Sequence, residues 1–258
     1  MSRLIFLLQY AASRRASAAS LRSGPGALAE ALARRVPTRL GVVVETIERR
    51  PDGGFEVFAR GSDGALLLRA DAIVLAVPPA AVLAVGDGVL TAAEKDHFRT
   101  VRQRPALALA LVTRDGVAPP ARRIVVSEPE RALRVLQLPG AVQPGASELL
   151  VAVSSWRFAR DNATTADDVV IRRLTAEAER FAPRHVREIQ AARVVRWPEG
   201  LPCFGVGHYR ALARLRRVEA WQLAAGRRLA LAGDHLVGPR LEDAVASGLR
   251  AADSLAGS

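Results

Sequence analysis

Two residues near the carboxyl end of the chain have types and a spacing that suit the binding of a sugar hydroxyl. Gly233 and Asp234 follow the apolar run 229–232. Glycine permits a tight turn or a close backbone approach where a side chain would collide, and the aspartate places a hydrogen-bond acceptor at the end of a strand. This arrangement suits a ribose or a ribityl chain. A strand-loop-helix unit of any α/β protein can carry the same pair, and that purely structural interpretation stays open.

A helix is expected directly after this turn, and it adds a second binding feature. Gly238 and Pro239 form a loop, and residues 241–244 open the helix. The first turn of a helix has unpaired N–H groups and the positive end of the helix dipole, which favour an anion or a carbonyl oxygen. Small residues let a backbone or a ligand lie close to this helix: Ala244, Ala246, Gly248, Ala251 and Ala252.

The order of these elements resembles the flavin-binding segment of a family of amine oxidases, protoporphyrinogen oxidases and carotenoid or squalene-type desaturases. The matching elements are Ala-Gly-Asp at 232–234, Gly-Pro at 238–239 and Leu-Glu-Asp-Ala-Val-Ala-Ser-Gly at 241–248. By this resemblance the acidic residue bonds the ribityl or pyrophosphate region of FAD, and the helix points its first turn at the pyrimidine edge. The resemblance implies non-covalent FAD contacts at Gly233, Asp234, Glu242, Asp243 and Ala244.

An earlier block resembles the same family. It reads as a helix at 27–35, strands at 39–50, 55–60 and 65–69 around a Gly-Gly hairpin turn, and Ala-Asp-Ala-Ile-Val-Leu-Ala-Val-Pro-Pro at 70–79. The run 73–77 is continuously apolar, which predicts a parallel strand buried on both faces. The resemblance places the backbone of Val44 beside the FAD adenine.

The pattern Gly24-x-Gly26-x-x-Ala29 imitates a dinucleotide-binding fingerprint. That fingerprint must follow a buried strand within a βαβ unit, whereas residues 12–20 are rich in arginine and serine and residues 2–20 have helical spacing. Family members begin with the βαβ unit, so the resemblance covers roughly their carboxyl-terminal half. Three explanations stay open: a truncated product, an N-terminal partner chain that completes the FAD site, or a non-catalytic remnant that does not bind FAD alone.

The middle of the chain is predicted to form a substrate-binding domain over 81–224. After a helix over 80–98, apolar runs separated by Pro and Gly predict an antiparallel sheet, followed by a helix at 167–181 and a strand at 191–197. The strands of this sheet are expected at 105–113, 122–126, 133–138 and 148–155. The partial FAD-binding domain then comprises 1–80 and 225–258, with 1–22 alternatively a substrate-domain helix. The expected fold class is α+β: an incomplete α/β-type FAD-binding part and a substrate domain with a mostly antiparallel sheet and helices.

Residues 197–208 resemble the substrate-side segment of protoporphyrinogen oxidases, with a Trp, then Leu-Pro, then Val-Gly-His. The resemblance implies substrate contacts at Pro202, Phe204 and His208, although a histidine at a helix start also bonds locally. The strand at 102–111 lacks the lysine that amine oxidases hold near the flavin. With an apolar middle sheet, this favours a hydrophobic substrate that passes hydride to flavin. The flavin carries the chemistry in such enzymes, so no catalytic residue is assigned.

Composition argues against several other classes. The net charge is +11, but the arginines are dispersed and almost no aromatic residues lie among them, which argues against nucleic-acid binding. A peripheral contact with an anionic membrane stays open. Cys203 is the only cysteine, so an internal disulfide is excluded and a cytoplasmic location is expected. The four histidines lack ligand spacing, so no metal site is expected, and no apolar run approaches the roughly 18 residues of a membrane span.

Overall fold

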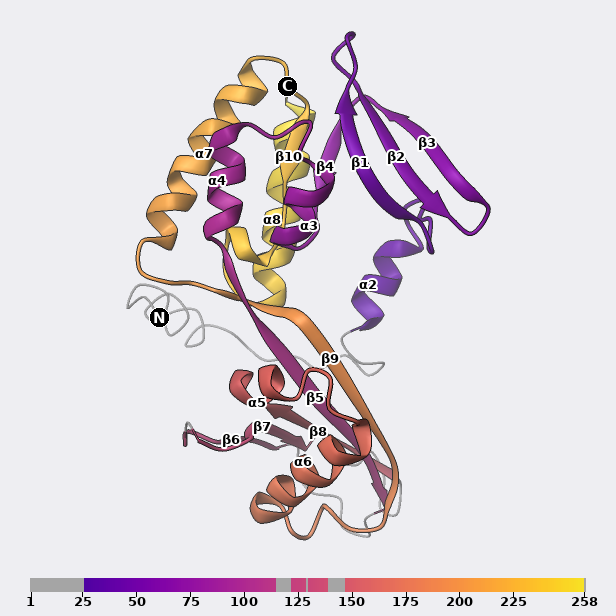
Figure 1. The fold of residues 1–258 in the computed structure, drawn as a ribbon, viewed down its shortest axis with the longest axis vertical. Coiled ribbons are helices and arrows are strands. Elements are labelled where there is room, and N and C mark those ends of the chain that lie inside the picture. Colours follow the sequence, from indigo (N-terminus) through magenta and orange to yellow (C-terminus); the bar gives the residue numbers. More distant parts are fainter. Residues whose placement is uncertain (1–25, 115–121, 129, 139–146, 258) are drawn as a thin grey trace. The chain divides into compact units, whose positions relative to one another are not determined.

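The computed structural model describes residues 26–114, 122–128, 130–138 and 147–257 (Figure 1). The helix expected at 2–20 and Gly24 of the imitation fingerprint lie outside these residues. The chain divides into two compact units. The split unit combines the residues up to Arg102 with Cys203 and the residues after it, and the inserted unit is Gln103–Pro202. The fold class is α+β, as the sequence predicts.

The split unit contains a three-stranded antiparallel meander in the order β1-β2-β3. Its strands are β1 (Val43–Arg49), β2 (Phe55–Gly61) and β3 (Gly64–Ala70). Gly53 has a φ of +94°, a backbone conformation that favours glycine, so the predicted Gly-Gly turn is confirmed. The pairing of β1 with β2 shifts register between Val44 and Thr46. The helix predicted before this meander is present as α2 (Gly26–Ala33).

A pair of short parallel strands forms the centre of the split unit. Strand β4 (Ile73–Leu75) pairs with β10 (Leu229–Leu231), with Ile73 opposite Leu229. The parallel pairing expected for the run 73–77 is confirmed, but burial on both faces is wrong, because Val74 is 42% exposed. Val74 points to the opposite face of the sheet from Leu75, and β10 is the only strand that pairs with β4 among the described residues, so no side chains of a second neighbouring strand cover this face.

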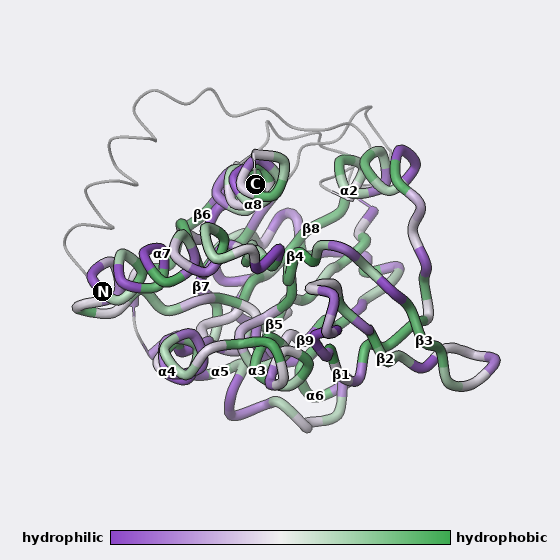
Figure 2. Tube along the Cα trace, turned by 90° about the horizontal axis from the view of Figure 1, so that it is seen from above, coloured by the Kyte–Doolittle hydropathy of each residue, from purple (hydrophilic) through white to green (hydrophobic). Residues whose placement is uncertain are grey.

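Three helices cover one side of this pair. They are α3 (Pro79–Val85), α4 (Ala92–Thr100) and α7 (His208–Ala224), and α4 packs beside α7 (Figure 1). The single helix expected over 80–98 is thus two helices, because Thr91 and Glu94 form a capping box that starts α4 anew. Helix α3 is hydrophobic almost throughout, as Figure 2 shows. The shared core comprises Ile47, Phe55, Leu75, Phe98, Leu212, Leu215, Leu229 and Leu231.

The final helix, α8 (Leu241–Ala256), packs on the β4–β10 pair through a separate, smaller hydrophobic cluster. Ala251 and Leu255 of α8 contact Ala230 and Ala232, the small residues of and after β10. Small side chains at this contact bring the helix close to the strand. Strand β10, a loop and α8 therefore follow one another as the sequence predicts.

The inserted unit is a five-stranded sheet in the order β6-β7-β8-β5-β9, in which the β6-β7, β7-β8 and β8-β5 pairs are antiparallel. The antiparallel sheet and helix α6 (Asp167–Phe181) agree with the prediction. Helix α6 contributes Val170, Leu174 and Ala178 to a core of strand leucines. The remaining elements are β5 (Arg102–Arg114), β6 (Arg122–Val125), β7 (Leu133–Leu138), β8 (Ser147–Ser154), α5 (Trp156–Asp161) and β9 (Ile189–Cys203).

The boundaries of the two units differ from the predicted domain boundaries at 80/81 and 224/225. Helices α3, α4 and α7 fall in the split unit, because Val82, Phe98 and Leu212 pack in the same core as Leu229. The chain contributes to this unit both before and after the inserted unit. Among the described residues, no helix has the length and apolar character needed to cross a membrane.

Candidate functional site

The loop that follows β10 is built around a glycine. This Gly233 loop, residues 233–240, begins with Gly233 at a φ of +149°. A Cβ atom at this position would lie 2.4 Å from Cε1 of His235, closer than any real Cβ contact. His235 is 2% exposed and its ring lies edge-on to Phe98 at 5.8 Å. Glycine is therefore required here because the imidazole of His235 packs directly under the backbone.

Asp234 presents a partly open carboxylate at the end of β10. Its side chain is 38% exposed, and Oδ1 accepts a hydrogen bond from the N–H of His235 at 2.7 Å. Its carbonyl oxygen accepts from the N–H groups of Val237 and Gly238, which closes the short helix η1 (Asp234–Leu236). No protein hydrogen bond to Oδ2 is present within the described part of the chain. The carboxylate thus has acceptor capacity directed to solvent or to a ligand.

The start of α8 carries the three other predicted contacts of this segment. The carboxylate of Asp243 accepts from the N–H of Arg240 at 3.1 Å and pairs with its guanidinium. Asp243 therefore caps the helix and is mostly withdrawn from solvent, with 14% of its side chain exposed. Glu242 is exposed and Ala244 is half-buried. Gly238 passes close to Asp243, because a Cβ there would lie 2.6 Å from Oδ2.

A hydrogen bond joins the loop to α8 behind these residues. The N–H of Gly233 donates to Oγ of Ser247 at 3.0 Å, and Ser247 is fully buried. Gly233, Asp234 and Asp243 are thereby brought into one strand-loop-helix junction. Val44 lies elsewhere in the split unit, on edge strand β1, and is 37% exposed. Strand β1 and the Gly233 loop nevertheless share one hydrophobic core, because Ile47 of β1 and Leu236 of the loop belong to the same cluster of buried residues.

The residues predicted to meet substrate lie in protein-packed positions. Phe204 is 6% exposed, and its ring lies edge-on to His208 at 4.8 Å and parallel to Tyr209 at 6.3 Å. His208 begins α7 as the local interpretation expects, after Gly207 at a φ of +86°. Pro202 is buried near the end of β9. Cys203 is a half-buried free thiol.

Three histidines gather beside this group, which sequence reasoning missed. His97, His208 and His235 come from α4, α7 and η1, and the rings of His97 and His208 are 6.4 Å apart. Burial, reinforced by the charges that His208 and His235 would carry, lowers the pKa of His97 to about 4. Burial likewise lowers the pKa of His208. Burial thus favours the neutral imidazoles of His97 and His208. No spacing along the sequence signals a cluster that is drawn from three elements.

A metal centre is not formed by the described residues, in which no group of three or more His, Cys, Asp or Glu side chains is arranged around a common point. The histidine rings instead contact Phe98, Phe204 and Tyr209. We name these six residues, His97, Phe98, Phe204, His208, Tyr209 and His235, the ring cluster. The ring cluster packs against the Gly233 loop through His235, whose imidazole lies next to the backbone of Gly233.

Comparison with protein families decides what this junction belongs to. The model of the family "Flavin containing amine oxidoreductase" matches residues 2–256. The chain belongs to this family. Membership implies a flavin cofactor, and it confirms the resemblance on which the Gly233 loop was interpreted. No curated protein matches the chain.

Solved structures of other proteins show a similar fold. A putative protoporphyrinogen oxidase from Exiguobacterium sp. 255-15 superposes with a TM-score of 0.70 at 19% identity, over 93% of this chain and 52% of that one. A putrescine oxidase variant redesigned in cofactor binding gives 0.68 at 16% identity, over 91% and 53%. A fatty acid isomerase from P. acnes gives 0.61 at 18%, over 90% and 51%. The chain therefore spans about half the length of the structures that it matches.

The residues at the junction fit part of such a cofactor. Asp234 offers a carboxylate acceptor suited to a ribityl hydroxyl, and the N–H groups of Leu241 and Glu242 have no backbone acceptor among the described residues. Donors at a helix start suit the carbonyl oxygens of a flavin pyrimidine ring. The full Gly-x-Gly-x-x-Gly fingerprint, which would hold a pyrophosphate between a strand and a helix, does not occur among the described residues.

Proposed function

We propose that this chain is the FAD-contacting and substrate-binding portion of a flavin-dependent oxidoreductase that acts on a hydrophobic small molecule. The observation that carries the proposal is the junction of β10, the Gly233 loop and α8. There an open carboxylate and a free helix start lie together on a backbone that admits only glycine. Family membership supplies the chemical class.

Each residue of the junction has a distinct part in this proposal. The carboxylate of Asp234 accepts a hydrogen bond from a ribityl hydroxyl of FAD. The free N–H groups and dipole of α8 stabilise negative charge at the pyrimidine edge. When bound, the flavin supplies the capacity to take a hydride from a carbon or carbon–nitrogen bond, and oxygen or a quinone restores it. Asp243 acts indirectly, because its hydrogen bonds to Arg240 fix the first turn of the helix.

The remaining parts of the proposal concern the cofactor's other end and the substrate. The backbone of Val44, on the open edge of the meander, contacts the adenine. Residues 81–224 serve as the substrate-binding part of the chain, with Pro202, Phe204 and His208 on the substrate side. We propose a cytoplasmic protein, in keeping with its single free thiol.

A nucleotide-binding βαβ unit completes the site in this proposal, supplied upstream or by an N-terminal partner chain. Strand β4 pairs only with β10 among the described residues, and Val74 is 42% exposed. A parallel strand normally has neighbours on both sides and cover on both faces. The unpaired edge of β4 is therefore where an additional parallel strand would pair, and the matching structures are about twice as long as this chain.

The test is the visible spectrum of the purified protein, made alone and together with the sequence encoded upstream of it. Flavin absorbance in the assembled form, with little in the chain alone, is the expected result. Flavin in neither sample would overturn the proposal and favour a cofactor-free module that keeps the fold without catalysis. Release of flavin on denaturation is expected as well, since attachment is non-covalent.

A matched pair of variants then tests the site. Asp234→Asn removes the charge and part of the acceptor capacity at the junction, so FAD should bind about tenfold or more weakly. Asp253→Asn makes the same chemical change at an exposed position of α8 and should leave FAD affinity unchanged. Equal affinities for the two variants would show that Asp234 does not contact the cofactor.

A further inference from the structure

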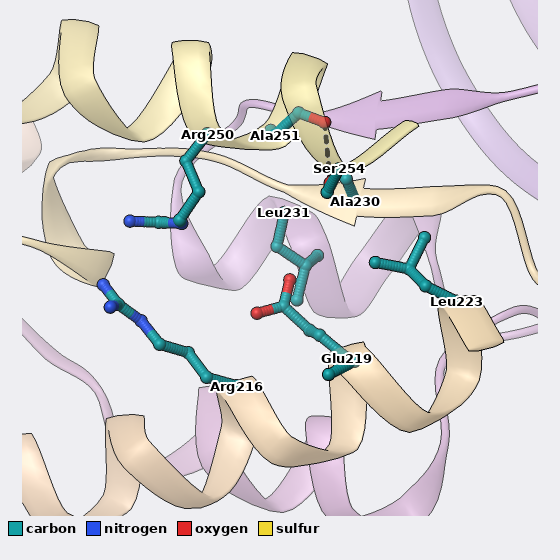
Figure 3. Close-up of a pocket in the computed structure, with 9 residues that line it drawn as sticks. Arg216, Glu219, Leu223, Ala230, Leu231, Arg250, Ala251 and Ser254 are labelled. Atoms are coloured by element: carbon teal, nitrogen blue, oxygen red, sulfur yellow. Dashed lines mark hydrogen bonds between the residues drawn. The ribbon is translucent and has the colours of Figure 1, made fainter. Parts of the chain in front are cut away.

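A small pocket lies beside strand β10, where helices α7 and α8 flank it. Residues of α7, β10 and α8 enclose a volume of about 190 Å³. Figure 3 shows Arg216 of α7 and Arg250 of α8 pointing toward one another at one end, and Glu219 directed into the space between the helices. Leu223, Ala230 and Leu231 line the rest. Three charged groups thus converge on a mostly apolar space within the split unit.

The charges in this pocket are not balanced by ion pairs. Within the described part of the chain, Glu219 has no arginine nitrogen within 4 Å, so it forms no salt bridge with Arg216 or Arg250. Burial and the nearby Arg216 lower the pKa of Arg250. Burial raises the pKa of Glu219, which disfavours the negative charge that would otherwise balance the two arginines. Two guanidinium groups that repel one another are held together without a matching carboxylate contact.

We propose that this pocket binds a small oxyanion, of which inorganic phosphate is the model, between the guanidinium groups of Arg216 and Arg250. Arginine presents planar pairs of donors that match phosphate and carboxylate oxygens. A bound anion replaces the repulsion between the two cations with attraction to both. The volume is below the roughly 300–1,000 Å³ of sites for drug-sized molecules, so the ligand is small.

The two arginines also hold the Gly233 loop, which gives the anion site a consequence. Arg216 donates through Nη2 to the carbonyl oxygen of Leu236 at 3.1 Å. Arg250 donates through Nη2 to Oγ of Ser247 at 3.2 Å, and the same oxygen accepts the N–H of Gly233. An anion that reorients either guanidinium therefore acts on the backbone beside Asp234. The site goes beyond the proposed function, because it needs neither flavin nor substrate.

The test titrates the full chain, free of flavin, with inorganic phosphate at constant ionic strength and follows binding by calorimetry and thermal unfolding. Arg216→Gln and Arg250→Gln should each weaken phosphate binding about tenfold or more, the usual effect of losing a charge-assisted hydrogen bond. Arg217→Gln is the matched control, because Arg217 is exposed on the same helix and outside the pocket. Glu219→Gln should not weaken phosphate binding, because burial already disfavours the negative charge of this carboxyl group.

Two outcomes would overturn the site. One is phosphate that stabilises the chain no more than chloride does, and the other is an equal loss of phosphate binding in Arg217→Gln, which would mark a response to net charge alone. If Arg250→Gln fails to fold, Arg250→Lys keeps the charge but loses the planar donor pair, and weaker phosphate binding is still expected. A parallel titration with acetate assigns the site: binding equal to phosphate indicates carboxylates, and weaker binding indicates phosphates.

Discussion

Oγ of Ser247 lies 3.0 Å from the backbone nitrogen of Gly233 and accepts its hydrogen bond in the interior of the split unit. This contact joins the end of β10 to the second turn of α8. It is the only hydrogen bond described for the N–H of Gly233, and Ser247 is fully buried. The shape of the junction therefore depends on one hydroxyl group.

Removal of the Ser247 hydroxyl should lower the stability of the protein. Ser247→Ala leaves the half-buried N–H of Gly233 without an acceptor and deprives Arg250 of one, so the free energy of unfolding should fall by about 1–2 kcal/mol. Urea unfolding measures the change. Ser254→Ala is the control, because its hydroxyl only donates to the carbonyl of Ala251 in the same helix, and it should change stability by less than about 0.5 kcal/mol. Equal effects would show that the contact does not stabilise the junction.

Gly233 itself should not accept a side chain. Gly233→Ala places a Cβ 2.4 Å from Cε1 of His235 at a φ of +149°, and should lower the free energy of unfolding by about 2 kcal/mol or more. Gly248→Ala is the control, and it should raise the free energy of unfolding instead of lowering it. No atom lies within 4 Å of a Cβ at this position of α8, so alanine should stabilise the helix by about 0.5–1 kcal/mol. A neutral Gly233→Ala variant would contradict the packing of His235 beneath the loop.

The ion pair of Glu94 and Arg227 should be the most sensitive charged contact of the split unit. The two side chains are 0% and 4% exposed, and Nη1 of Arg227 donates to Oε2 of Glu94 at 2.8 Å. Glu94→Gln keeps a polar group for the capping box with Thr91 but leaves Arg227 buried without its counter-charge. Chemical denaturation should show a loss of about 3 kcal/mol. Glu45→Gln breaks the exposed pair with Arg60 and should cost at most about 0.5 kcal/mol, so similar losses would refute the distinction.

Stability should fall with acidification because of the ring cluster. His97 is 7% exposed, and burial lowers its pKa from 6.5 to about 4. The unfolded chain therefore takes up a proton first, so stability is complete above pH 6.5 and declines as the pH falls toward 4. The full loss is about 3 kcal/mol, and His208 acts in the same direction. Denaturant unfolding at pH 7.5 and pH 5.0 should show about 2 kcal/mol of this loss, and His97→Leu should reduce the difference in stability between the two pH values. An unchanged difference in that variant would count against His97 as its source.

Local patterns of the sequence predicted most individual elements. Helix α6 matches the expected range 167–181, because its acidic first turn and apolar spacing are complete within the segment. The hairpin turn before Phe55 and the sequence β10, loop and α8 follow from Gly and Pro positions for the same reason. Each of these signals lies within a few neighbouring residues.

Features that depend on distant residues could not be predicted in this way. The boundaries of the two units differ from the domain boundaries expected at 80/81 and 224/225, because Phe98 and Leu212 share a core with Leu229. No local pattern of the sequence reveals this shared core. The exposure of Val74 depends on whether another strand lies beside β4, and the histidine cluster depends on the packing of three separate elements. At the candidate site, the role of Gly233 was predicted in kind, but His235 as the group beneath it was not.

The pairing of β4 with β10 places a requirement on the order of events during synthesis. Ile73 leaves the ribosome before the whole inserted unit, whereas its partner Leu229 leaves after that unit. The inserted unit has its own core and can fold while β4 still lacks its partner. Formation of the junction at Gly233 is thus a late, long-range step, and strand β4 has no β10 to pair with until residues 229–231 have been synthesised.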